Sequence, residues 1–197
     1  MRCEVVHQSR PRVGERVSGD AVFVRSEGSV TLLVLIDALG HGETAAAIAA
    51  LSVEAVAASA PDCGVREQIE ILHRALEGTR GAAALVLRIE LRGPGGSSTL
   101  TGCSVGNVEL RSCHTRVPVV LSPGVLGVRL AKARLFEAEL GATERLVAFS
   151  DGISSRFELG ALARLPAREA CEGLMSSARR EHDDATVAIV DVRPKHE

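Results

Sequence analysis

The sequence predicts an α+β protein in which two antiparallel β-sheets pack on one another as a β-sandwich, flanked by helix pairs. Its strand-like and helix-like segments follow the order β-β-α-α-β…β-α-β, which keeps helices and strands in separate blocks. The middle third contains only short strand-like runs divided by turns. Strict alternation of strands and helices is missing, as are Gly-rich phosphate loops, which excludes a Rossmann-type sheet. At roughly 100–200 residues per domain, we expect a single domain over residues 1–197.

The first third predicts a β-hairpin followed by two helices. Ala21–Arg25 and Ser29–Asp37 are rich in Val, Leu and Ile, and the turn residues Ser26–Gly28 lie between them. The chain then becomes Ala-rich without a helix breaker, which predicts a helix over Glu43–Ala60. Apolar residues at helical spacing predict a second helix over Val65–Leu76.

The middle third predicts a meander of antiparallel strands, with a turn at Gly93–Gly96. Its strands are expected at Ala82–Leu91, Ser97–Cys103, Asn107–Cys113 and Arg116–Leu121. The last third predicts two more strands, a helical region broken at Pro166 and a closing strand. These segments are Ala133–Leu140, Glu144–Phe149, Gly160–Arg180 and Ala185–Val192.

Composition excludes several classes of function. The chain has 25 acidic and 23 basic side chains, and its aromatic residues are four Phe with no Tyr or Trp, so nothing suggests binding to nucleic acid or to an anionic membrane. The longest apolar run, Leu32–Ile36, is far shorter than the ~20 residues that span a bilayer. The start lacks a secretory signal, and the five scattered cysteines form no C-x-x-C pair. We therefore expect a cytoplasmic protein with free, buried thiols.

Aspartates stand at the predicted strand ends. Asp20 begins the hairpin and Asp37 ends it; Asp151 follows a later apolar strand, and Asp183 and Asp184 precede the last one. Carboxylates brought together repel one another, and divalent cations relieve that repulsion; hard oxygen ligands suit Mg²⁺ or Mn²⁺ rather than zinc. The alternative is that each Asp is a turn residue that accepts local hydrogen bonds. Spacing alone leaves both interpretations open.

Five short motifs in order carry a family resemblance. They are S-G-D (18–20), D-A-L-G-H-G-E-T-A (37–45), T-G-C-S-V-G-N-V-E-L-R (101–111), F-S-D-G-I (149–153) and D-D-A-T-V (183–187). From about Arg12 to Val192, this set resembles the protein phosphatase 2C family, and within it the bacterial SpoIIE/RsbU/RsbX branch. The length, which leaves no room for a sensor domain, is most similar to the stand-alone RsbX type.

The resemblance implies a metal-dependent serine/threonine protein phosphatase with the family's helix-flanked β-sandwich and two Mn²⁺ or Mg²⁺ ions. By the same resemblance, Asp37 would bridge both ions and Ala38 would offer its carbonyl to one. Asp151 and Asp183 would ligate the other ion, and Asp20 would act directly or through a water. The ions would activate a water for in-line attack on phosphorus. The implied substrate is a phosphorylated regulatory protein, namely a STAS-domain protein of a stressosome or partner-switching module.

Several positions depart from the family pattern. Ala38 stands where the family usually has Gly, which requires a backbone conformation that a residue with a Cβ adopts. Asp184 occupies the place of an Asn in many relatives, so we expect it behind the ligands. The phosphate-gripping Arg of eukaryotic relatives has no match, although Arg16 lies nearby in the sequence. His41 is either a general acid or a residue that only packs or hydrogen-bonds at the helix start.

The sequence allows alternative interpretations of three residues and of the function. We expect His182 to be a solvated neighbour of Asp183, with metal ligation as the alternative. We expect Arg179 and Arg180 to form a solvated helix end, with a docking contact as the alternative. At the level of function, the alternatives are a catalytically silent phosphatase-like module that binds a partner through Glu43–Ala60, and a small-molecule phosphohydrolase.

Overall fold

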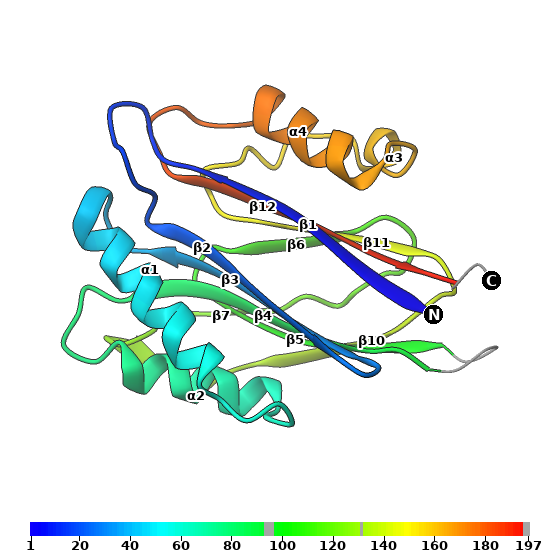
Figure 1. Ribbon diagram of the computed structural model, residues 1–197, viewed down its shortest axis with the longest axis horizontal. Helices are drawn as coiled ribbons and strands as arrows, with labels where there is room; N and C mark the ends of the chain where they lie inside the picture. The colour runs from blue at the N-terminus through cyan, green and yellow to red at the C-terminus, as the bar shows by residue number, and fades with distance from the viewer. Residues whose placement is uncertain (93–96, 131, 195–197) are drawn as a thin grey trace.

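The computed structural model describes residues 1–92, 97–130 and 132–194. Two sheets are stacked face to face; α1 and α2 cover the outer face of one, and α3 and α4 cover the outer face of the other (Figure 1). The predicted α+β sandwich with flanking helices is confirmed. The turn predicted at residues 93–96 lies outside the described residues.

The larger sheet contains the predicted hairpin. Its order is β10-β5-β4-β3-β2, antiparallel throughout, and the two-residue strand β7 pairs with β5 in parallel. The bounds are β2 Asp20–Glu27, β3 Val30–Ala38, β4 Ala82–Glu90, β5 Ser98–Val105, β7 Leu121–Ser122 and β10 Leu135–Leu140. Glu27 pairs with Val30, so a two-residue turn joins β2 to β3, and Gly28 adopts φ +58° there. Tight hairpin turns need such positive φ values, which glycine adopts without strain.

The smaller sheet contains a strand that the sequence reasoning missed. Its order is β1-β12-β11-β6, with bounds β1 Arg2–Arg10, β6 Glu109–Ser112, β11 Glu144–Phe149 and β12 Ala185–Arg193. A separate two-stranded ribbon joins β8 Gly124–Val125 and β9 Arg129–Leu130. The missed strand, β1, is an edge strand that pairs along its whole length with β12, from Arg2 opposite Arg193 to Arg10 opposite Ala185. Its partner lies at the other end of the chain, and its polar residues gave no clear apolar alternation.

The predicted meander is correct only as far as β5. The next strand, β6, joins the smaller sheet, so the chain crosses between the sheets after β5. The strand expected over Arg116–Leu121 is wrong: residues 116–120 are in no strand, and only Leu121 and Ser122 pair, as β7. Pro118 within this run has no N–H to donate to a neighbouring strand, which is the physical reason.

The helices begin and end close to the predicted positions. Their bounds are α1 Gly42–Ala57, α2 Val65–Ala75, α3 Leu159–Leu162 and α4 Ala167–Ser177. Pro166 is the N-cap of α4, so the predicted break is confirmed. The solvated helix end expected at Arg179–Arg180 is wrong, because α4 stops at Ser177. Arg179 is half-buried and bridges to Ile153, and the backbone N–H of Arg180 donates to Gly152 O at 2.8 Å.

Three apolar layers hold the elements together. In β3, Leu33 and Leu35 face the other sheet, whereas Val34 and Ile36 face α1 and α2. The third layer lies between the smaller sheet and α4, with Phe149 among its buried residues. Burial on both faces explains the continuous apolar run of β3. All five cysteines are free thiols.

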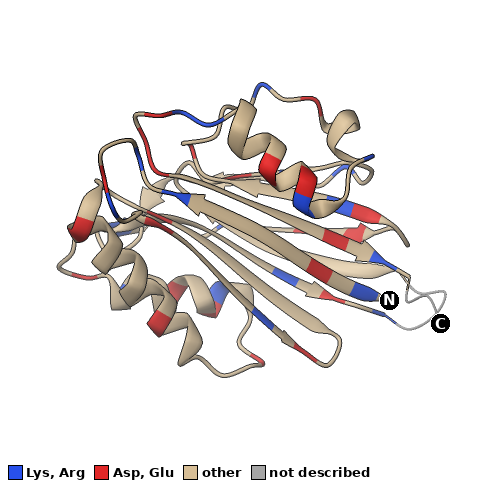
Figure 2. Cartoon of the chain, turned by 45° about the horizontal axis from the view of Figure 1, so that its top comes forward, with Lys and Arg blue, Asp and Glu red and all other residues tan. Residues whose placement is uncertain are grey.

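Charged residues are distributed over the whole described fold (Figure 2). Acidic and basic residues are interspersed along helices, strands and loops of the described chain (Figure 2). None of the described helices is long and apolar enough to cross a bilayer.

Candidate functional site

The predicted aspartates stand where β2 and β12 begin and where β3 and β11 end, and these strand ends lie at one end of the sandwich, on the left in Figure 1. Asp20 and Asp37 are opposite one another in the register of β2 and β3, in the larger sheet. Asp151 follows β11, and Asp183 precedes β12, both in the smaller sheet. The cluster is therefore assembled from two sheets, rather than along one edge of a single sheet.

Ser150 joins the two sheets at this point. Its buried hydroxyl donates to Asp20 Oδ2 at 2.6 Å and accepts from the backbone N–H of Thr186 at 3.0 Å. The backbone N–H of Ser150 donates to Thr186 O, also at 3.0 Å. One hydroxyl thus connects a carboxylate of the larger sheet to the last strand of the smaller sheet.

Asp184 organises the segment between β1 and β2, residues 11–19. Its Oδ1 accepts from the backbone N–H of Arg12 at 2.8 Å, and its Oδ2 accepts from that of Gly19 at 2.7 Å. A Cβ on Gly19 would lie 2.6 Å from the Cβ of Ala45 and 3.1 Å from Asp184 Oδ2, so the contact requires glycine. Both oxygens of Asp184 are therefore engaged by the protein's own backbone.

Gly152 allows the two strand ends of the smaller sheet to touch. A Cβ at this position would lie 1.8 Å from Asp184 O, which no side chain tolerates. The side-chain amide of Asn107 donates to Asp151 Oδ2 at 2.6 Å, and Asp183 Oδ1 accepts from the N–H of Asp184 at 3.0 Å. The sequence reasoning assigned no role to Ser150 or Asn107, although both lie inside the quoted motifs.

The electrostatics of the cluster favour a cation. Burial, followed by repulsion from Asp20, raises the pKa of Asp37 to about 8. Burial also raises the pKa of Asp20 to about 7. The hydrogen bond from Ser150 acts in the opposite direction and lowers that pKa, but burial has the larger effect. The pKa of Asp151 is raised by burial and then by Asp183. Within the described chain, none of these four aspartates forms an ion pair with Lys or Arg.

The residues present fit Mg²⁺ or Mn²⁺ bound in part through water. Asp37 Oδ2 is buried without a hydrogen-bond partner, so it is an oxygen donor with no ligand of its own. In the described residues, no three His, Cys, Asp or Glu side chains are arranged to hold one ion among themselves. Mg²⁺ commonly keeps several waters and takes only one or two carboxylates, which agrees with this arrangement. Ala38 lies in β3, and no described residue other than glycine has a positive φ, so alanine is accommodated there without strain.

The segment before β2 also reaches the start of α1. His41, the N-cap of α1, places its Nδ1 2.7 Å from Glu15 Oε1, and both side chains are partly exposed. Sequence reasoning did not single out Glu15. Arg16 and His182 are exposed. The exposed Arg180 lies near the cluster, because its backbone N–H donates to the carbonyl of Gly152, next to Asp151.

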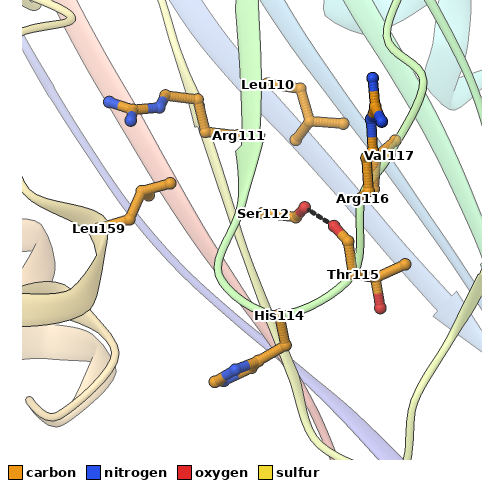
Figure 3. Close-up of a pocket in the computed structure, with 8 residues that line it drawn as sticks. All are labelled: Leu110, Arg111, Ser112, His114, Thr115, Arg116, Val117 and Leu159. Atoms are coloured by element: carbon orange, nitrogen blue, oxygen red, sulfur yellow. Dashed lines mark hydrogen bonds between the residues drawn. The ribbon is translucent and has the colours of Figure 1, made fainter.

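A hollow beside β6 does not form an anion site. Its volume is about 360 Å³, and Arg111 and Arg116 line it together with His114 (Figure 3). These three side chains point in different directions, and Arg111 donates to the carbonyls of Ser155 and Phe157. The hollow therefore lacks convergent charge.

Comparisons with known proteins match the chain through its fold. No protein-family model and no curated protein sequence matches it. A solved chain from work on the bacterial stressosome, described as a modular system adapted to control secondary messenger signalling, is 28% identical, with a TM-score of 0.87 and coverage of 96% of this chain and 100% of that one. RsbX in complex with magnesium is 21% identical, with a TM-score of 0.80 and coverage of 96% and 95%. The catalytic domain of the serine/threonine phosphatase PstP with two manganese ions is 17% identical, with a TM-score of 0.71 and coverage of 98% and 99%.

These structural neighbours belong to the protein phosphatase 2C family. The resemblance carried by the five motifs is thereby confirmed at the level of the fold.

Proposed function

Since the chain has the fold of the protein phosphatase 2C family, we propose that it is a metal-dependent phosphatase of phosphoserine and phosphothreonine in a regulatory protein. The observation that carries the proposal is the aspartate cluster at the end of the sandwich. Four carboxylates from two sheets meet there without basic partners, and an oxygen of Asp37 is buried and unpaired. Burial and mutual repulsion disfavour the charged form of these carboxylates, and a divalent cation would stabilise it.

In this proposal, two Mn²⁺ or Mg²⁺ ions are held by Asp37, the carbonyl of Ala38, Asp151 and Asp183, with Asp20 acting directly or through a water. When bound, the ions would activate a water molecule and would neutralise the charge that builds up during in-line attack on phosphorus. The chain's own residues hold the ligands in position. Ser150 orients Asp20, and Asn107 orients Asp151.

Proton release accompanies cation binding in this scheme. With a pKa of about 8, Asp37 carries a proton at neutral pH in the metal-free protein. A carboxylate must be deprotonated to ligate a metal. The affinity for the cation therefore falls as the pH drops below about 8, and binding at neutral pH releases protons.

The proposed substrate is a phosphorylated STAS-domain protein of a stressosome-like module. The support is the 28% identity to a chain from the stressosome, over nearly the full length of both chains.

The test is phosphate release by the purified full chain from p-nitrophenyl phosphate and a phosphoserine peptide, with Mn²⁺ and with EDTA. We expect activity only with the metal, and a loss of at least about a thousandfold in Asp37→Ala, because a ligand and its charge are removed. Asp62→Ala, which removes an exposed carboxylate outside the cluster, is the control and should keep full activity. Activity that persists in EDTA or in Asp37→Ala contradicts the proposal.

A silent, partner-binding module is the second candidate. The lack, in the described residues, of three side chains arranged around one ion fits a silent module as well as a cation held partly through water. Calorimetric titration with Mn²⁺ separates the two: the phosphatase binds the metal and releases protons, whereas a silent module binds it weakly or not at all. A small-molecule phosphohydrolase would instead turn over the free ester better than the peptide.

A further inference from the structure

An apolar groove runs between α3, α4 and the segment that follows Asp151. Its volume is about 640 Å³. Apolar side chains of Phe157, Ala161, Leu162, Leu165 and Leu174 line it, and none of them takes part in the aspartate cluster. Ala161 is exposed, and Leu165 is 38% exposed, which leaves apolar surface open to solvent on α3 and directly after it.

The groove walls are held rigidly. The ring of Phe157 packs edge-on against the buried Phe149, with ring centroids 5.3 Å apart. The guanidinium of Arg111 lies 4.7 Å from the centroid of the same ring. Arg145 donates hydrogen bonds to the carbonyls of Leu162 and Leu165. The groove is therefore preformed, so filling it costs little ordering of the protein.

A short backbone ladder connects the groove to the aspartate cluster. At the cluster end, Arg180 N–H donates to Gly152 O at 2.8 Å, one residue beyond Asp151. At the groove end, Ser154 N–H donates to Ala178 O at 2.7 Å, and both of these residues line the groove. Gly152 and Ser154 are two residues apart, which is at most about 7 Å along the chain.

The charges around the groove indicate what occupies it. The exposed Arg180 is hydrogen-bonded through its backbone to Gly152, beside Asp151, and the exposed Arg156 lines the groove. Neither arginine forms a salt bridge within the described chain, although Glu158 also lines the groove. Exposed guanidinium groups beside an apolar surface suit a phosphorylated polypeptide, whose phosphate oxygens accept their hydrogen bonds.

We propose that this groove docks the phosphoprotein substrate by receiving an apolar side chain two residues away from the phosphorylated serine or threonine. In an extended peptide, side chains two residues apart lie on the same face, about 7 Å apart, which matches the length of the ladder. The inference rests on the proposed phosphatase function and specifies which substrates that site selects.

The probes are fluorescently labelled peptides of eleven residues that carry a non-hydrolysable phosphonate in place of phosphoserine. One peptide has Leu two residues before it, one has Leu two residues after it, and the reference peptide has Ser at both positions. Binding to the full chain with Mn²⁺ is followed by fluorescence anisotropy, and turnover of p-nitrophenyl phosphate is measured in parallel. We expect one Leu peptide to bind about tenfold more tightly than the reference, because a leucine side chain leaves water.

Two variants of the groove test its location. Leu165→Glu places a charge at the rim, and Ala161→Phe fills the space from α3; each should bring the Leu preference below about twofold. Both should leave turnover of p-nitrophenyl phosphate unchanged, because neither residue lies in the cluster. Leu51→Glu is the matched control: Leu51 has the same 38% exposure but lies on α1, and its variant should keep the preference.

Three results would overturn the inference: no Leu preference in the parent protein, a preference that survives both groove variants, or an equal loss in Leu51→Glu. A concentration-dependent dimer in sedimentation velocity that Leu165→Glu dissociates would also overturn it, since a second copy would then occupy the groove. Failure of the proposed function looks different. In that case p-nitrophenyl phosphate turnover is absent in every variant, while the anisotropy still reports whether the groove binds.

Discussion

At the residue scale, Asp37 carries a carboxylate whose burial lowers the stability of the metal-free fold. Asp37 lies opposite Asp20 in the register of β2 and β3, and its Oδ2 is buried without a hydrogen-bond partner. A buried, unpaired acidic oxygen costs free energy unless a proton or a cation accompanies it. The pH dependence of stability therefore reports directly on this residue.

We expect the metal-free protein to lose stability as the pH rises from 5 to 8. The folded pKa of Asp37, about 8, lies above the unfolded value of 3.8, so the folded state binds the proton more tightly between these values. This contribution is complete at low pH and is lost as the pH rises through the folded pKa. The free energy of unfolding is measured by urea denaturation with EDTA. Its decrease between pH 5 and pH 8 should be smaller in Asp37→Asn by at least about 1.4 kcal/mol, the equivalent of one pKa unit. Equal pH dependence in both proteins would rule this out.

Ser150 offers a second test at the same scale. Ser150→Ala removes the donor to Asp20 and the acceptor for the N–H of Thr186, both buried. We expect the free energy of unfolding to fall by about 1–3 kcal/mol, because two polar groups lose their partner. Ser52→Ala is the control: this buried hydroxyl donates only to the carbonyl of Ile48 within α1, which already serves the helix. If Ser150→Ala lowered the free energy of unfolding no more than Ser52→Ala, the role of Ser150 in joining the two sheets would be contradicted.

At the element scale, α3 depends on a side chain from another part of the chain. Four residues are too few for a stable helix on their own. Arg145, 3% exposed, forms a two-pronged pair with Asp191 and donates to the carbonyls of Leu162 and Leu165. The hydrogen bonds that Arg145 donates to Asp191 raise the pKa of Arg145, which keeps the pair charged. Arg145 thereby attaches α3 to the smaller sheet.

Arg145→Ala should lower the free energy of unfolding by about 3 kcal/mol, because it leaves the buried Asp191 with only the partly exposed Arg193 as a partner. Amide hydrogen exchange over residues 159–165 should accelerate more than exchange in β11. Arg193→Ala removes another partner of Asp191, but that side chain is 38% exposed and should cost at most about 1 kcal/mol. Similar costs for the two variants would show that Arg145 does not hold α3.

The elements that the sequence missed share a physical cause. β3 is a strand buried on both faces, and α1 is a long Ala-rich helix. The residues of each element therefore predict its secondary structure without reference to any other part of the chain. The edge strand β1 owes its existence to hydrogen bonds with β12, almost the whole chain length away. Conversely, residues 116–120 carry the apolar residues of a strand but have no pairing partner. Local composition does not encode partners that lie elsewhere in the chain.

At the scale of the whole molecule, the aspartate cluster spans the seam between the two sheets. Asp20 and Asp37 belong to the larger sheet, and Asp151 and Asp183 to the ends of the smaller one. In the metal-free protein these carboxylates disfavour one another's charged forms. A cation held by both pairs, as the proposed function requires, would reverse the sign of that interaction.

Mn²⁺ or Mg²⁺ should therefore raise the melting temperature of the chain. A metal concentration one hundred times the dissociation constant adds about 2.7 kcal/mol to the free energy of unfolding. The rise should be absent in Asp151→Asn and Asp37→Asn, and it should shrink at pH 5.5, where protons compete for Asp37. Calorimetry with and without EDTA measures it. An unchanged melting temperature at millimolar metal would count against a cation across the seam.

The sequence by itself determined the fold class, most of the helices and strands, and the aspartates that the structure gathers at one end. These features follow from residue periodicity, turn residues and motif order, all of which are local properties. Only the tertiary structure decided that β5 and β6 belong to different sheets and that Ser150, Asp184 and Gly152 join the strand ends. It also decided that a groove opens three residues after Asp151, at Ser154. The reason is that strand pairing and sheet packing depend on the free energy of contacts between segments distant in sequence, which no local pattern contains.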